Sequence, residues 1–126
     1  TLYEHQQIDK IGVAYLDLNG LKQINDTQGH EAGDEFIRLA AAILNQVFSD
    51  HAYRIGGDEF VVFCPDIEST DFQQKVQQLQ KLMSQHRVSV SIGSLWNEKT
   101  TNFNQMLKKA DRLMYKEKEF YHKKNS

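Results

Sequence analysis

Two carboxylates stand next to each other directly after a pair of glycines, in the segment Gly56-Gly57-Asp58-Glu59. The flanking segments His51–Ile55 and Phe60–Cys64 are short and rich in apolar and aromatic residues, which predicts two strands joined by a tight hairpin. We expect the glycines to supply positive φ at its tip. A turn without side chains lets another molecule approach the backbone, and two adjacent acids concentrate negative charge there. These residues therefore predict a divalent cation site at the turn.

Another carboxylate, Asp17, lies near the end of the apolar segment Ile11–Leu18. A nearly uninterrupted apolar run predicts a central strand that is buried on both faces. A carboxylate at the end of such a strand is unfavourable unless an opposite charge offsets it. Asp17 is therefore a candidate metal ligand, because hard divalent cations prefer oxygen donors. The alternative is that Asp17 caps the helix predicted to follow.

Asn25 and Asp34 stand on either side of Gly29, which separates two predicted helices at 19–27 and 31–49. An amide and a carboxylate that converge at this break could contact the edge of a guanine, with the amide at O6 or N3 and the acid accepting from N1 and N2. Asn and Asp also favour helix ends for local reasons. The residue types alone leave both interpretations open.

Amphipathic segments supply the scaffold for these residues. The helix at 31–49 carries an apolar stripe, a third helix is predicted at 71–85, and a last helix follows residue 102. Alternation at 88–93 predicts a half-buried strand. The residues predicted to face inward are Phe36, Leu39, Ala40, Ile43, Leu44 and Val47, then Phe72, Val76, Leu79 and Met83, and finally Phe103, Met106, Leu107, Ala110, Leu113 and Met114.

The predicted order of elements is βααββαβα. This order indicates an α+β fold, an α/β sandwich with a ferredoxin-like, mostly antiparallel central sheet and helices packed on it. The chain has 126 residues, a net charge of −2 and 25% charged residues, which predicts one globular domain. Its longest apolar run is too short for a membrane span or a signal peptide, so we expect a cytoplasmic segment without membrane contact, which a membrane anchor could precede in the full protein.

Two other classes of function are disfavoured by the residues. The single cysteine, Cys64, is expected to be buried at a strand end, and the five histidines lack the spacing of a zinc site. The same fold occurs in RNA-binding modules, but the predicted strands show no pair of exposed aromatic rings and the net charge is slightly negative. We therefore expect no nucleic acid partner.

Four blocks in this order resemble the GGDEF domain of bacterial diguanylate cyclases, which condense two GTP molecules into cyclic di-GMP. The blocks are Asp17–Asp34, Gly56–Phe60, Ser91–Gly93 and Ala110–Lys118. The resemblance runs from about Ile11 to about Lys118. It implies a nucleotidyl-cyclase-like fold and a single GGDEF domain over residues 1–126. The family's short Asp-x-Leu-Thr block is not convincingly supplied by Thr1-Leu2-Tyr3, so we expect a trimmed or degenerate start.

The resemblance also implies roles for particular residues. Two Mg²⁺ or Mn²⁺ ions per active site would be bound by Asp17, the Leu18 carbonyl and Asp58. Asp58 would also assist deprotonation of the attacking hydroxyl, next to Gly57. Glu59 would either support a neighbouring ligand or pair with a phosphate-binding lysine. The guanine contacts would be Asn25 and Asp34, and the phosphate contacts Asn19, Gly20, Leu21, Lys22 and Lys118.

Two departures from the family pattern qualify these expectations. Tyr121-His122 replaces the glycine-arginine pair that usually follows the last lysine, so the rigid guanidinium fork is missing and triphosphate affinity is expected to be weaker. Val47-Phe48-Ser49-Asp50 stands where the family often has Arg-x-x-Asp. Val47 replaces the arginine and Asp50 remains, so we expect no product-inhibition site, and Val47 fits the core better.

The reaction joins two nucleotides twice, whereas one domain would carry one GTP. The resemblance therefore implies that two copies face each other in a homodimer, which an upstream sensor domain in the full protein would control. The alternative is a catalytically weak or inactive GGDEF domain that binds GTP or a protein partner as a regulatory module.

Overall fold

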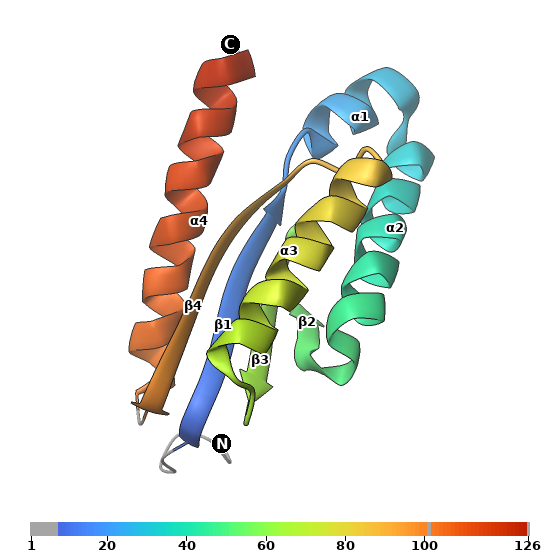
Figure 1. The fold of residues 1–126 in the computed structure, drawn as a ribbon. Helices are drawn as coiled ribbons and strands as arrows, with labels where there is room; N and C mark the ends of the chain where they lie inside the picture. Colours follow the sequence, from blue (N-terminus) through green and yellow to red (C-terminus); the bar gives the residue numbers. More distant parts are fainter. Residues whose placement is uncertain (1–7, 101, 126) are drawn as a thin grey trace.

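The computed structural model describes residues 8–100 and 102–125 (Figure 1). The expectation for the block at Thr1–Tyr3 lies outside the described residues. The elements in chain order are β1 (Ile8–Leu18), α1 (Leu21–Gln28), α2 (His30–Phe48), a 3-10 turn (Ser49–His51), β2 (Ala52–Arg54), β3 (Glu59–Pro65), α3 (Ser69–Gln85), β4 (Val90–Thr100) and α4 (Phe103–Asn125).

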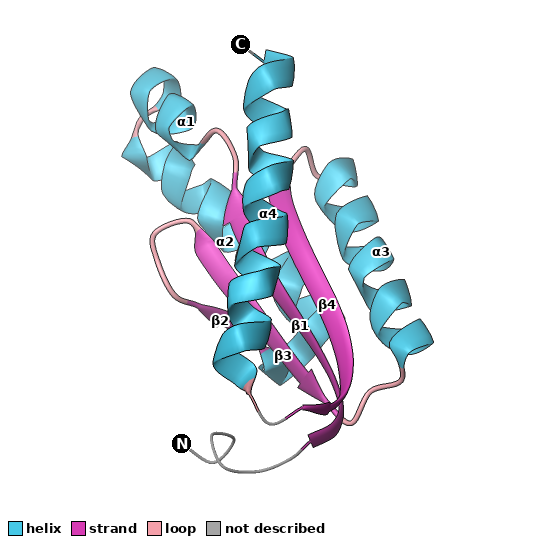
Figure 2. Ribbon diagram, turned by 90° about the vertical axis from the view of Figure 1, so that its left-hand side faces the viewer, coloured by secondary structure: helices cyan, strands magenta, loops and turns pink. Residues whose placement is uncertain are grey.

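The strands form one sheet in the order β2-β3-β1-β4, and every neighbouring pair is antiparallel. Helices α2 and α3 cover one face of this sheet, whereas α4 crosses the other face (Figures 1 and 2). The predicted α+β architecture is therefore confirmed. As predicted, the apolar run of β1 is the central strand, because helices pack against both of its faces.

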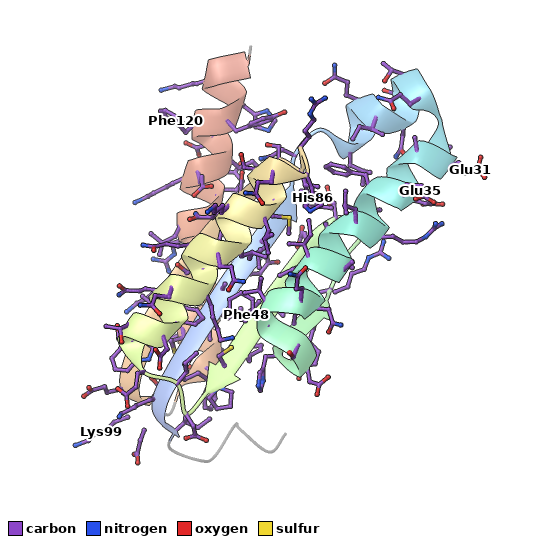
Figure 3. All side chains as sticks on the ribbon, turned by 45° about the vertical axis from the view of Figure 1, so that its right-hand side comes forward. Glu31, Glu35, Phe48, His86, Lys99 and Phe120 are labelled. Carbon is purple, nitrogen blue, oxygen red and sulfur yellow. The ribbon has the colours of Figure 1, made fainter. Side chains whose placement is uncertain are left out.

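Alternation along β1 divides the core into two layers. Ala14 and Leu16 join the larger cluster under α2 and α3, whereas Ile11 and Val13 join a smaller cluster with Met106 and other residues under α4. Between α2 and α3, the rings of Phe48 and Phe72 lie 6.1 Å apart (Figure 3). The prediction for the third helix is confirmed, since its four inward residues, Phe72, Val76, Leu79 and Met83, are all buried.

Two residues predicted to face the core are exposed instead. Leu39 on α2 retains 36% of its accessible surface, and Leu113 on α4 retains 42%. Their neighbours Ala40 and Met114 are buried. Each exposed leucine lies at the border of its helix's apolar stripe, where helical periodicity alone does not decide which side chain reaches the sheet.

The strand predicted at 88–93 differs in extent and burial from β4. Pairing with β1 continues from Leu18↔Val90 to Ile8↔Thr100. Residues 94–100 are mostly polar, so the sequence pattern does not predict that they form a strand. Ser91 and Gly93, which we expected to face solvent, are buried. Helix α4 covers their side of the sheet, so this part of β4 is buried on both faces.

Cys64 is buried as predicted, and burial raises the pKa of its thiol to about 11. Over the described part of the chain, no helix combines the length and apolarity that crossing a membrane requires.

Candidate active site

The carboxylates converge because two strand ends meet. Asp17 lies opposite Glu59 in the β1–β3 ladder, and the Leu18 N–H donates to the Asp58 carbonyl over 2.9 Å. This bond ties the end of β1 to the turn before β3. The structure thereby brings the predicted metal ligands Asp17, Leu18 and Asp58 to one end of the sheet.

Asp17 lies in a partly buried and strongly charged environment. Its side chain is only 14% exposed, and its Oδ2 atom accepts from Lys118 Nζ at 2.8 Å. Its Oδ1 atom is buried and has no hydrogen-bond partner among the described residues. Burial is the main cause that raises the pKa of Asp17, the Lys118 ammonium group opposes it, and the negative charges of Asp58 and Glu59 add to it.

These observations fit a divalent cation. A buried oxygen without a partner and a surplus of negative charge are both stabilised by a positive ion. Among the described residues, no three His, Cys, Asp or Glu side chains form a complete metal site. An ion bound by Asp17 and Asp58 would therefore take its other ligands from the Leu18 carbonyl and from a bound phosphate, which is how Mg²⁺ is often held.

The turn before β3 differs from the predicted hairpin. Neither Gly56 nor Gly57 has a positive φ, so the expectation of left-handed glycines at the tip is wrong. Instead, the N–H groups of Ile55 and Gly56 both point to the Glu59 carbonyl. The Arg54 guanidinium group donates to the carbonyls of Gly56 (3.0 Å) and Gly57 (2.8 Å). The arginine therefore fixes the turn that presents Asp58.

Glu59 is held by a residue that the sequence analysis missed. The Tyr15 hydroxyl donates to Glu59 Oε2 over 2.7 Å, and burial together with this carboxylate raises the pKa of Tyr15. Among the described residues, the hydrogen-bond partner of the Glu59 carboxylate is this tyrosine, and the Glu59 backbone lies opposite Asp17. Tyr15 stands two residues before Asp17 on the same strand face, and that spacing was the available signal.

A cavity of about 660 Å³ opens beside these strand ends. In Figure 1, α1 and the C-terminal half of α4 stand on either side of it. Gly20 precedes α1 with a φ of 81°, a conformation that favours glycine, and no side chain caps the first N–H groups of the helix. The lining residues are Leu18, Gly20, Leu21, Lys22, Gln23, Asp26, Thr27, Asp58, Lys118, Tyr121 and His122.

Asn19, a predicted phosphate contact, is held by bonds within the protein. It is 5% exposed, its amide group donates to Ser89 Oγ (3.1 Å), and its Oδ1 atom accepts from Ser91 (3.2 Å). Its backbone N–H donates to the Ser89 carbonyl. These bonds fasten the loop after β1 to β4 and hold the Asn19 side chain against Ser89 and Ser91.

Asn25 and Asp34 lie near each other on α1 and α2. Asn25 Oδ1 is so close to Gly33 that a Cβ atom at Gly33 would lie 1.8 Å from it. A side chain at Gly33 would require the Asn25 amide to move, and the next residue is Asp34, whose side chain is exposed. The contact of the Asn25 amide with α2 thus lies one residue before Asp34.

The stretch that replaces the family's inhibitory motif is partly core. Val47 is 4% exposed on α2, which confirms the prediction that it belongs to the core, and its carbonyl accepts from Lys75 Nζ at 3.0 Å. Asp50 is exposed in the 3-10 turn. A core valine cannot supply the donors that an arginine would.

Comparison with other proteins identifies the family to which the sequence is similar. The sequence profile of the family described as "Diguanylate cyclase, GGDEF domain" matches residues 1–124. The signalling protein YkoW of Bacillus subtilis (strain 168) is 35% identical over 129 residues, which cover 92% of this chain and 16% of YkoW. The cyclic di-GMP phosphodiesterase PdeR of Escherichia coli (strain K12) is 32% identical over 126 residues, covering 91% of this chain and 19% of PdeR. The chain thus spans less than a fifth of either relative.

Solved structures show the same fold. The GGDEF domain of DgcB from Caulobacter crescentus, in complex with c-di-GMP, superposes with a TM-score of 0.79 at 25% identity, covering 88% of this chain and 73% of that one. The active GGEEF domain of a diguanylate cyclase from Vibrio cholerae has a TM-score of 0.76 at 22% identity, covering 86% and 76%, and supports the fold alone. With the profile match over nearly its whole length, the chain belongs to the family of diguanylate cyclase GGDEF domains.

Proposed function

We propose that this domain is a diguanylate cyclase that condenses two GTP molecules into cyclic di-GMP and two pyrophosphates. The observation that carries the proposal is that Leu18 and Asp58 line the 660 Å³ cavity and that Asp17, which has an unpartnered buried oxygen, is joined to the lining residue Lys118. This combination of oxygen donors suits Mg²⁺ or Mn²⁺.

Two lysines in the lining of the cavity suit a triphosphate. Lys22 lies in the first turn of α1, and Lys118 approaches from α4. The free N–H groups at the start of α1 add partial positive charge. Gly20 and Leu21 form this entrance, and the absence of a side chain at Gly20 leaves the backbone accessible. The phosphates would lie between the two lysines.

Asn25 and Asp34 would bind the base. The Asn25 amide can meet O6 or N3 of guanine, and the Asp34 carboxylate can accept from N1 and N2. Adenine offers no N2 amino group and no N1 hydrogen. A carboxylate at residue 34 therefore favours GTP over ATP.

The chemistry is an attack of a 3′-hydroxyl on an α-phosphate. When bound, two divalent ions would draw charge from the phosphate and acidify the hydroxyl. Asp58, in the turn that Arg54 fixes, would assist removal of the hydroxyl proton. Lys22 and Lys118 would hold the leaving pyrophosphate, and Glu59, bound by Tyr15, contributes negative charge beside Asp17.

Each domain would hold one GTP, so two domains must face each other with antiparallel substrates. A homodimer is therefore part of the proposed mechanism. This chain covers only 16% of YkoW and 19% of PdeR, so these relatives contain much more than this domain. By analogy, a further domain in the full protein would control the pairing.

A second candidate is a GTP-binding regulatory module with little or no turnover. Tyr121 and His122 line the cavity where the family usually has a glycine-arginine pair, and they lack the bidentate fork that grips phosphate. One relative, PdeR, is moreover named as a phosphodiesterase.

One assay separates the two candidates. The protein is incubated with GTP and Mg²⁺ or Mn²⁺ over a hundredfold range of protein concentration, and the products are separated by chromatography. A cyclase gives cyclic di-GMP, with specific activity that rises with concentration until the domains are paired. GTP binding without product at the highest concentration would establish the regulatory module instead.

A further inference from the structure

The Lys118 ammonium group contacts two of the three residues assigned to the metal, Asp17 and Leu18. Its Nζ atom lies 2.8 Å from Asp17 Oδ2 and 3.3 Å from the Leu18 carbonyl oxygen. The Lys118 side chain is 20% exposed, so this contact is partly shielded from solvent. The same side chain forms part of the cavity wall that holds Asp58.

A divalent ion held by the Asp17 carboxylate and the Leu18 carbonyl would share these two ligands with the Lys118 ammonium group. With metal–oxygen distances of about 2.0–2.6 Å, the ion would be a close neighbour of the ammonium group. Two cations at such short separation in a partly buried site repel each other strongly. Lys118 and the ion therefore exclude one another at these two oxygens.

We propose that Lys118 is an internal cation that competes with the divalent metal for Asp17 and Leu18, and that the nucleotide's phosphates draw it away. The proposal rests on the proposed function, because it takes the triphosphate as the second partner of the ammonium group. It adds a role that a phosphate-binding lysine alone does not have. Before nucleotide arrives, Lys118 weakens metal binding.

The flexible stem of lysine makes this exchange feasible. An ammonium group is a point charge on a four-carbon chain, so it can move from the carboxylate to a nearby phosphate without a change in α4. The triphosphate then gains a cation and the two oxygens become free for the metal. Metal and nucleotide binding are consequently coupled, and each increases the affinity for the other.

Lys22 provides a matched control. It lines the same cavity from α1 and is exposed, and it would also contact phosphate. It lies on α1, whereas Lys118 lies on α4 and contacts Asp17. Removing its charge should weaken nucleotide binding without changing the affinity for metal alone.

The test compares wild type, Lys118→Met and Lys22→Met by titration calorimetry, first with Mn²⁺ alone and then with a non-hydrolysable GTP analogue at fixed Mn²⁺. Methionine keeps the apolar stem and removes the charge. We expect Lys118→Met to bind Mn²⁺ alone about ten-fold more tightly than wild type, within the usual range of coupling, and the analogue more weakly. Lys22→Met should change only the second titration.

Lys118→Met removes the counter-charge of Asp17 and can therefore lower the stability of the fold. The thermal midpoint of unfolding is the second readout, because it is measured for each variant with and without Mn²⁺. Mn²⁺ should raise the thermal midpoint of Lys118→Met more than that of wild type, and Lys118→Met/Asp17→Asn should lose this gain. Equal or weaker Mn²⁺ binding by Lys118→Met, with no larger thermal shift, would overturn the proposal. If the analogue binds no variant, the proposed function fails, while the titration with Mn²⁺ alone still decides the competition.

Discussion

Asn19→Ala should destabilise the fold and leave nucleotide affinity nearly unchanged. The substitution removes the side-chain bonds to Ser89 and Ser91. Two neutral hydrogen bonds are worth about 1–3 kcal/mol, and a buried hydroxyl left without an acceptor costs about 1–3 kcal/mol. Ser91 is 0% exposed, so water cannot replace the amide oxygen. The lost hydrogen bonds and the unsatisfied hydroxyl are partly the same effect, so we expect the free energy of unfolding to fall by about 2–4 kcal/mol.

The measurements are urea denaturation and thermal melting. For 126 residues, the entropy of unfolding is about 0.26 kcal/mol per kelvin, so the expected loss lowers the melting temperature by about 8–15 °C. Asn45→Ala, on the exposed side of α2, is the control and should change stability by less than about 0.5 kcal/mol.

A double-mutant cycle sharpens the test. Asn19→Ala/Ser91→Ala should cost less than the sum of the single variants, because alanine at residue 91 leaves no hydroxyl unsatisfied. The structural interpretation is refuted if Asn19→Ala keeps the wild-type free energy of unfolding and binds GTP at least about ten-fold more weakly, a loss of about 1.4 kcal/mol.

Three further predictions concern other parts of the molecule. Tyr15→Phe should lower the free energy of unfolding by about 1–2 kcal/mol and reduce turnover less than Asp58→Ala does, because Glu59 loses a hydrogen bond but stays in place; wild-type stability and activity would contradict this. Cys64 should react with iodoacetamide far more slowly in the native protein than in urea from pH 7 to 9, since its pKa of about 11 keeps the thiol neutral; equal rates would show that it is accessible. Cyclic di-GMP should not bind at Val47–Asp50, as calorimetry on Asp58→Ala can test; two product molecules per chain, lost in Asp50→Ala, would disprove it.

Local patterns predicted the parts of the fold that depend on local physics. The spacing of Phe72, Val76, Leu79 and Met83 placed α3 on the sheet, because a single helix face suffices to bury them. The second half of β4 was missed because residues 94–100 are mostly polar and are ordered by pairing with β1. Ser91 is buried because helix α4 covers that side of the sheet, and the sequence around Ser91 does not predict this burial.

In the candidate site too, some features could be predicted from the sequence, whereas contacts between distant segments could not. The resemblance named Asp17, Leu18 and Asp58, and antiparallel pairing brings them together. Contacts between distant segments escaped prediction: Tyr15 and Glu59 are 44 residues apart, and Asn19 and Ser91 are 72 apart. The turn glycines were misjudged because two N–H groups share the Glu59 carbonyl there, without left-handed residues.

The most direct test of the cyclase assignment is to measure pyrophosphate and cyclic di-GMP together in wild type and Asp58→Ala, with circular dichroism as the check on folding. The proposed mechanism predicts two pyrophosphates for each cyclic di-GMP from wild type, and neither product from a folded Asp58→Ala. Asp17→Asn should behave like Asp58→Ala. Unchanged product formation by folded Asp58→Ala would contradict the assignment of the oxygen cluster as the catalytic centre.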